Sequence, residues 1–292
     1  MVLPAHVLDA VTAGDISAVA AWLDEGGDVN DTRPDVIAIL PSETLLMLIP
    51  QSREVTSRHV EMAKMLLRRG ADVNYVPEEN RDGLSALHLC VDFQAYSEPH
   101  EEDVFMGLLQ LYIDAGGDMN LKDADGRTSL GIALTTRSGL DDKWHDEMRR
   151  RRTLATVTIL LRNGASLDAV DRASDAPFAT KLSAEEILRR MEFDPPIDPL
   201  YRDEYFIACK ALVSDVRAAG GTWKQYVLHM PKALLRLRSL VARGRARTVK
   251  RLRARTPREI ELLFAPTFPN ELCWRVLEYW NPRYEARRTP SP

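Results

Sequence analysis

The clearest hydrophobic pattern of the chain lies between residues 60 and 74. Its apolar residues fall at helical spacing and predict one buried face of an amphipathic helix; they are Val60, Met62, Ala63, Leu66 and Leu67. Gly70 follows, and glycine ends helices readily because a left-handed backbone conformation costs it nothing. The stretch therefore predicts a helix that ends at Gly70 and continues into a short loop.

The same helix ending occurs four times along the chain. The copies are Gly26-Gly-Asp-Val-Asn30, Gly70-Ala-Asp-Val-Asn74, Gly116-Gly-Asp-Met-Asn120 and Gly164-Ala-Ser-Leu-Asp168. Each copy follows an amphipathic segment, and the glycines lie 44, 46 and 48 residues apart. A repeat of this length predicts a solenoid in which each unit packs against its neighbours.

These residues resemble a known family. The helix with its Gly-Ala-Asp-Val-Asn ending resembles the second helix and exit loop of ankyrin repeats. The segment Asp82–Cys90 is similar to the family's opening motif, with Ser85-Ala-Leu-His88 in place of Thr-Pro-Leu-His, and Asp125–Ala133 is a more divergent copy. The resemblance covers about residues 5–175. It implies an all-α ankyrin-repeat solenoid and a structural, hydrogen-bonding role for His88.

The pattern predicts four clear units and a partial fifth within residues 1–193. The predicted helices are Ala5–Thr12, a second helix capped by Asp15, Thr44–Ile49, Val60–Arg69, Ala86–Phe93, Val104–Asp114, Ser129–Leu134, Leu154–Asn163 and a last one from the capping box at Ser183 to Glu192. Each unit exceeds the roughly 33 residues of an ankyrin unit. The surplus lies near Pro50–Ser57, Gln94–Glu102 and Thr135–Arg152, and two interpretations stay open: one binding edge, or tolerated loops.

A proline-rich segment at 194–200 predicts a linker, because closely spaced prolines cannot continue a helix. Beyond it we expect a basic helical domain at 201–281 and a disordered tail at 282–292. A helix is predicted over Tyr201–Ala219, ended by Gly220 and Gly221, and further helices over Ile260–Phe264 and Phe268–Trp280.

Charge divides the chain in the same place. Residues 201–292 hold 19 Lys and Arg against 8 Asp and Glu, a net charge of +11, which leaves −15 for residues 1–200. Between Lys224 and Arg258 there are 12 basic residues and no acidic one. This run is read as a solvated face or a contact for acidic surface, or as a site for nuclear import or partner docking, with nucleic acid disfavoured as a partner.

Two further resemblances concern the C-terminal helices. Pro231–Arg243 is similar to the first helix of a SOCS box, and Phe268–Leu272 with Leu277–Tyr279 is similar to a later segment of that box. Phe268–Leu272 also resembles the opening of an F-box. A SOCS box would imply a substrate receptor that docks elongin and a cullin, although Arg238 stands where that family has a buried cysteine. The alternative is that these helices only cap the solenoid.

Catalysis is not expected. The six histidines show no metal-ligand spacing, and no phosphate loop or nucleophile elbow is present. Cys90, Cys209 and Cys273 form neither a disulfide framework nor a zinc pattern, and Cys90 is expected to be buried and inert. The start of the chain lacks signal-peptide features and no apolar run is long enough for a membrane span, so an intracellular location is expected, cytoplasmic or, with an import signal at Arg251–Arg255, nuclear. No cofactor or metal is expected.

The predicted function is protein recognition, as a scaffold or adaptor that binds through the concave face and loops of the repeats. The predicted contact residues lie in the loops after the repeated endings; they are Asp31, Arg33, Tyr75, Glu79, Arg81, Lys122 and Asp125. The acidic repeats favour a basic segment of a partner. The alternatives are a cullin-type ubiquitin-ligase receptor and a purely structural, self-packed domain.

Overall fold

The structure is a computed structural model of the chain, which describes residues 3–33, 42–94, 102–135, 147–168, 171–172, 181–193 and 203–244, with Pro269 and Leu272. The chain divides into two compact units, Met1–Asp215 and Val216–Pro292. Within the described part of the chain, no helix has both the length and the apolar character that crossing a membrane requires.

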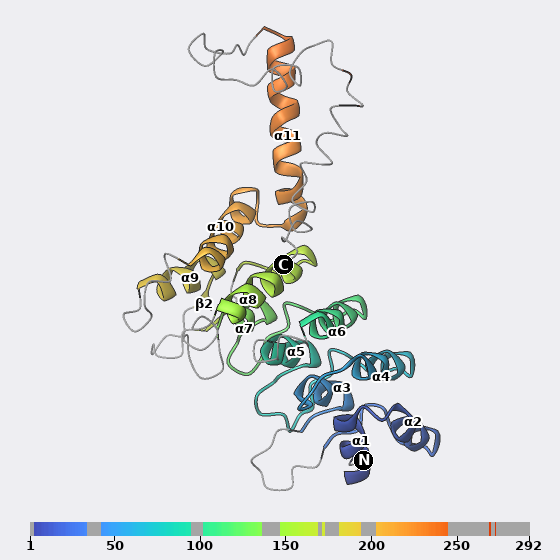
Figure 1. Cartoon of the computed structure of the whole chain (residues 1–292). Coiled ribbons are helices and arrows are strands. Elements are labelled where there is room, and N and C mark those ends of the chain that lie inside the picture. Colours follow the sequence, from blue (N-terminus) through green and yellow to red (C-terminus); the bar gives the residue numbers. More distant parts are fainter. Residues whose placement is uncertain are drawn as a thin grey trace. The chain divides into compact units, whose positions relative to one another are not determined.

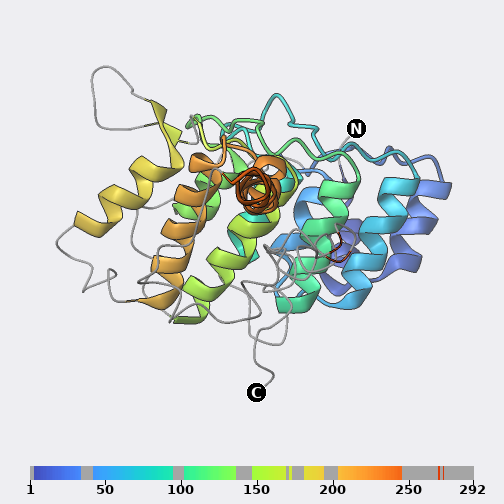
Figure 2. The same cartoon turned by 90° about the horizontal axis from the view of Figure 1, so that it is seen from above.

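The first unit is a stack of helix pairs in two layers (Figures 1 and 2). One layer holds the first helices of the pairs, each in contact with the next: α1 (Ala5–Ala13), α3 (Leu45–Leu48), α5 (Ala86–Gln94), α7 (Ser129–Leu134) and α9 (Ala184–Phe193). The other holds the second helices: α2 (Ile16–Asp24), α4 (Ser57–Arg68), α6 (Glu102–Asp114) and α8 (Glu147–Arg162). A short 3-10 helix, η1 (Ile49–Gln51), extends α3. The prediction of an all-α fold is confirmed.

Capping side chains near the helix N-termini determine where several helices begin. The side chain of Asp15 accepts hydrogen bonds from the backbone N–H groups of Ser17 and Ala18, which confirms the predicted cap of α2. Helix α4 begins at Ser57, three residues before the predicted Val60. Its N-cap is Thr56, whose backbone N–H donates to Nδ1 of His59 and whose hydroxyl is hydrogen-bonded to the same nitrogen. Helix α8 likewise begins at Glu147, seven residues before the predicted Leu154.

The glycine ending closes more of the described helices than the four that the repeat predicted. Helix α1 ends in this way at Gly14, where the N–H of Asp15 bonds to the carbonyl of Ala10, and five further copies follow. In each copy the N–H that follows the glycine bonds to the carbonyl five residues earlier; the pairs are Gly27–Trp22, Ala71–Leu66, Gly117–Tyr112, Ala165–Leu160 and Gly221–Val216. The glycines before these donors have φ values between 91° and 117°, in the region that favours glycine. The last copy, at Gly220 and Gly221, ends α10 (Glu204–Ala218), where the sequence predicted a helix end.

The Asp-Val-Asn segment that follows each glycine links neighbouring units. Within a unit, the carboxylate of Asp72 accepts from the N–H of Asn74 at 2.9 Å. Between units, the Asn74 side chain accepts from the N–H of Asp118 at 2.7 Å and donates to the carbonyl of Gly116 at 2.9 Å. The same acceptor bond joins Asn30 to Asp72 and Asn120 to Ser166. These bonds form a ladder along the stack, which we call the asparagine ladder.

The core lies between the two layers. Leu45, Leu46 and Met47 of α3 are at most 1% exposed, so most of the short helix is buried. The Tyr112 side chain of α6 is also fully buried, and its hydroxyl donates to the carbonyl of Leu46 at 2.8 Å. Burial raises the pKa of Tyr112, because the charged phenolate would lose its hydration there. This bond joins the second helix of one unit to the first helix of the preceding unit.

The N-terminal part of α10 belongs with the repeats. The Arg150 side chain of α8 pairs with Asp203 at 2.7 Å, just before α10, and Lys210 pairs with Glu192 of α9. Phe206 and Cys209 are fully buried. The division between the compact units therefore falls within α10, at Asp215 and Val216, whereas the sequence placed it at 194–200, outside the described residues. The partial fifth unit thus gains a second helix.

Two other features differ from the sequence pattern. A two-residue antiparallel pair joins β1 (Asp171–Arg172) to β2 (Lys181–Leu182), just before α9. In the second unit, α11 (Trp223–Ala242) begins at the cap Thr222 and includes Pro231, so the segment expected to start a SOCS-box helix lies inside a longer one. The helix predicted over 260–264, most of that over 268–280, and the tail at 282–292 lie outside the described residues.

The asparagine ladder predicts a measurable contribution to stability. Asn74→Ala removes two hydrogen bonds between units and should lower the free energy of unfolding by about 1–2 kcal/mol, measured by urea denaturation. Asn30→Ala removes one such bond and should cost about half as much.

Asn163→Ala is the matched control, because the Asn163 amide donates to the carbonyl of Ile159 in α8, the helix that Asn163 directly follows. Its effect should stay within about 0.5 kcal/mol of zero. Equal losses for Asn74→Ala and Asn163→Ala would contradict a role of the ladder in joining the units.

Candidate binding surface

Two loops between helix pairs lie against each other in the first unit. One runs from Tyr75 to Ser85 and the other from Leu121 to Thr128. The backbone N–H of Ala124 in the second loop donates to the carbonyl of Asp82 in the first at 2.9 Å. Gly83 permits this approach: its φ is +64°, and a Cβ there would lie 2.7 Å from the Ala124 nitrogen. The loops are therefore held together by backbone atoms.

His88 fixes the start of the second loop by a hydrogen bond to the backbone of Leu121. The N–H of Ser85 donates to Nδ1 of His88 at 3.1 Å, so Nδ1 is the acceptor and Nε2 carries the proton. Nε2 then donates to the carbonyl of Leu121 at 3.0 Å, 33 residues away. This is the structural role that the resemblance implied for His88. Burial lowers its pKa, outweighing the bond to Leu121 and the nearby charge of Asp123, which raise it.

A buried ion pair between Arg127 and Asp123 lies within the second loop. Arg127 Nη2 lies 2.8 Å from Asp123 Oδ2, and their side chains are 8% and 0% exposed. Asp123 also accepts from the backbone N–H of Arg127 at 2.8 Å, so its carboxylate has several donors. A buried charge that is paired and hydrogen-bonded in this way fixes the conformation of the loop around it. This pair could not be recognised from the sequence, because its spacing resembles that of any polar turn.

The structure brings five of the seven predicted contact residues to exposed positions on these two loops. Tyr75 is 40% exposed, which is high for a large aromatic side chain. Glu79, Arg81 and Lys122 are exposed as well, and the Asp125 carboxylate is exposed although it lies 3.0 Å from Arg127. We call these five residues the loop surface: Tyr75, Glu79, Arg81, Lys122 and Asp125.

The other two predicted contact residues are placed differently. Asp31 is 6% exposed, which leaves little of its side chain for a partner. Arg33 Nη2 lies 2.7 Å from Glu43 Oε2, in a pair that connects two parts of the first unit. Both residues sit beside the bridge between Thr32 and Thr44, so the fold uses them internally. We leave them out of the loop surface.

A second histidine makes a link that the sequence analysis missed. His59 of α4 is 2% exposed, and its Nδ1 accepts from the N–H of Thr56 at 3.1 Å. Its Nε2 lies 3.4 Å from the carbonyl of Thr12 in the preceding unit. The signal was present, because Thr56 precedes His59 as Ser85 precedes His88, with the same spacing of three.

Other reactive groups on the described residues are structural. Cys90 is fully buried, as the sequence predicted, and burial raises its pKa; burial also raises that of Cys209, to about 12. Thiolates are therefore disfavoured at both positions. The described residues hold no group of three or more metal-ligating side chains close enough to bind a metal ion.

Comparison with known proteins identifies one repeat directly. Residues 44–76 match the family model of the ankyrin repeat, from the start of α3 to the loop after α4. This match supports an ankyrin-repeat protein, a class whose repeats typically bind other proteins and are not enzymes. No curated protein matches the sequence of the chain significantly. The resemblance of the C-terminal helices to a SOCS box or an F-box stays a prediction.

The contact between the loops can be tested at Gly83. Gly83→Ala should lower the free energy of unfolding by about 2–3 kcal/mol, because the new methyl group meets the backbone of Ala124 in addition to the strained φ. Gly70→Ala separates the two causes: its φ is +91°, yet a Cβ there meets nothing within 4 Å. That control should cost only about 1–2 kcal/mol, and equal losses would show that the loops separate freely.

The burial of neutral His88 predicts acid sensitivity. Since its folded pKa is lowered, the unfolded chain binds the proton more readily, and stability should fall as the pH drops below the unfolded value of about 6.5. Between pH 7 and pH 5 the wild type should lose more stability than His88→Gln, measured by urea denaturation at each pH. Other groups titrate in both proteins and cancel in the difference. Parallel pH profiles would contradict this assignment.

Proposed function

We propose that this chain is a protein-recognition module whose partner binds the loop surface. The observation that carries the proposal is that exposed side chains of mixed chemistry stand on loops whose backbones are fixed. The bond from Ala124 to Asp82 and the bond from His88 to Leu121 hold the two loops in one arrangement. A surface ordered before binding loses less conformational entropy on association, which favours affinity.

The composition of the loop surface suits protein recognition. Tyr75 offers an aromatic ring and a hydroxyl, and Arg81 offers a planar guanidinium; tyrosine and arginine are enriched among the residues that dominate binding energy at interfaces. Glu79, Lys122 and Asp125 surround them with charges of both signs. Such a rim favours specificity and orientation more than raw affinity.

The charge of the repeats favours a basic partner. Residues 1–200 carry a net charge of −15, so a basic segment would be attracted before it reaches the loop surface. Association of that kind should slow as salt screens the charges. The scaffold or adaptor role and the basic partner segment are parts of this proposal. The ubiquitin-ligase alternative rests on Pro231–Arg243, at the C-terminal end of α11, and on segments 268–272 and 277–279, which lie mainly outside the described part of the chain, so it stays a prediction.

The experiment is affinity capture from cell lysate with the tagged full chain, followed by quantitative mass spectrometry. A double variant, Tyr75→Ala with Arg81→Glu, should retain the specific partners at least about tenfold less than the wild type, as expected when two central contacts are lost. Raising the salt concentration should reduce retention by the wild type.

The matched control is Arg53→Glu, which reverses an exposed arginine in another loop of the same unit. It should retain the partners at the wild-type level. Retention that is unaffected by the double variant, or no specific retention by the wild type, would overturn the proposal. Recovery of elongin or a cullin only with a chain that includes residues 201–292 would instead support the ligase alternative.

A further inference from the structure

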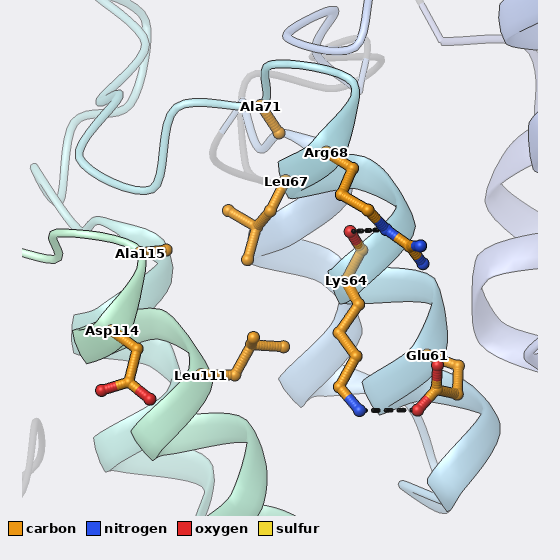
Figure 3. Close-up of a pocket in the computed structure, with 8 residues that line it drawn as sticks. All are labelled: Glu61, Lys64, Leu67, Arg68, Ala71, Leu111, Asp114 and Ala115. Carbon is orange, nitrogen blue, oxygen red and sulfur yellow. Dashed lines mark hydrogen bonds and ion pairs between the residues drawn. The ribbon is translucent and has the colours of Figure 1, made fainter.

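The outer face of the second helices holds a groove that is separate from the loop surface. It lies between α4 and α6 and has a volume of about 620 Å³ (Figure 3). Its lining is made by residues that recur at the helical spacing of three and four: Glu61, Lys64, Leu67, Arg68 and Ala71 on α4 and the loop after it, and Leu111, Asp114 and Ala115 on α6 and the residue after it. We call it the outer groove.

The outer groove has an apolar middle and charged sides. In Figure 3, Leu67 and Leu111 face the space between the helices, with Asp114 on one side and Lys64 and Arg68 on the other. Both leucines are only partly covered by the fold. The groove therefore presents an apolar stripe with an acidic flank on α6 and a mainly basic flank on α4.

Arg68 and Asp114, on opposite flanks, each keep polar side-chain atoms that a partner could bind. Arg68 Nε donates to the carbonyl of Lys64 at 3.1 Å, and among the described residues its two terminal amino groups have no acceptor. Asp114 Oδ1 accepts from Gln110 at 2.7 Å, whereas no donor reaches Oδ2 within the same part of the chain. On the basic flank, Lys64 is paired with Glu61 at 2.7 Å, so Arg68 is the charge most open to a partner.

In the same layer, ion pairs connect the neighbouring pairs of helices, α2 with α4 and α6 with α8. Arg69 of α4's end pairs with Asp24 of α2 at 2.6 Å. Glu102 of α6 lies 3.6 Å from Arg151 of α8 and 4.0 Å from Arg152. Between α4 and α6 the described residues form no such pair, although acid and base stand on opposite sides. Of these three neighbouring pairs of helices, the one with the open groove is thus the one that no ion pair of the described residues bridges.

We propose that the outer groove docks an amphipathic helix of a partner protein. Its apolar stripe would pack on Leu67 and Leu111, because the exposed positions of α4 recur as they do where one helix packs along another. An acidic residue on one flank of the docked helix meets Arg68, and a basic residue on the other flank meets Asp114. This site is independent of the loop surface and of its partner.

The test uses the purified full chain and fluorescein-labelled helical peptides, read by fluorescence anisotropy. One peptide carries a leucine stripe with glutamates on one flank and lysines on the other. Two relatives carry lysines on both flanks or glutamates on both, and a fourth distributes the leucines around the helix. The mixed-flank peptide should bind best to the wild type, and the fourth should not bind.

Protein variants then assign the binding to the groove. Leu67→Glu should weaken binding of the mixed-flank peptide at least about tenfold. Leu23→Glu is the matched control, because Leu23 precedes Gly26 as Leu67 precedes Gly70 but does not line the groove, and it should bind as the wild type does. The double variant Tyr75→Ala with Arg81→Glu should also bind normally, which separates this site from the loop surface.

Charge reversal gives the sharpest outcome. Arg68→Glu makes both flanks acidic and should shift the preference to the peptide with lysines on both flanks; Asp114→Lys should shift it to the peptide with glutamates on both. Equal binding of all peptides, no saturable binding, or an unchanged preference in these variants would overturn the proposal. Self-association of the chain that Leu67→Glu abolishes would overturn it too, by assigning the groove to a second copy.

Discussion

The stack depends on hydrogen bonds between the loop that ends one helix pair and the loop that ends the next. Each asparagine of the ladder accepts from the first N–H after the helix ending of the following unit, as Asn74 does from Asp118 at 2.7 Å. That contact requires both helices to end at the same level, and the glycine ending ensures this because it closes each helix with the same bond pattern. Insertions elsewhere in a unit then leave the register of the stack unchanged, although the glycines are 44, 46 and 48 residues apart.

Several buried polar side chains connect neighbouring units through hydrogen bonds. Tyr112 reaches back to Leu46, His88 reaches forward to Leu121, and His59 approaches Thr12. Each of these is a buried group whose partner is a backbone carbonyl of a neighbouring unit, so a misplaced unit would leave it unsatisfied. Short first helices such as α3 bury little area of their own, and these bonds add the specificity that apolar contact lacks. The bond from His88 to Leu121 also helps to hold the second loop of the loop surface.

The two candidate surfaces differ in how far the sequence could reveal them. The loop surface follows from the repeat, since residues after each helix ending must lie in loops, and Tyr75, Arg81 and Lys122 are exposed there. Asp31 looked equivalent, yet it is buried, because the segment around it pairs with Thr44 and Glu43 far along the chain. The outer groove had no sequence signal. Its lining comes from residues 61–71 and 111–115, which are far apart in the sequence, and each set of spacings alone is that of any solvated helix face.

The sequence by itself determined the repeat, the helix ends and most of the core stripes, because these depend on the local preferences of glycine, on capping residues and on helical periodicity. It also predicted the end of α10 at Gly220. It predicted a linker at the prolines, whereas the division between the two compact units falls within α10. Only the tertiary structure decided that α10 joins the repeats through Asp203 and Lys210, that His59 approaches Thr12 of the preceding unit, and which charges are paired or open. Pairing depends on which side chains meet across units, and local preferences do not encode distances between residues far apart in the chain.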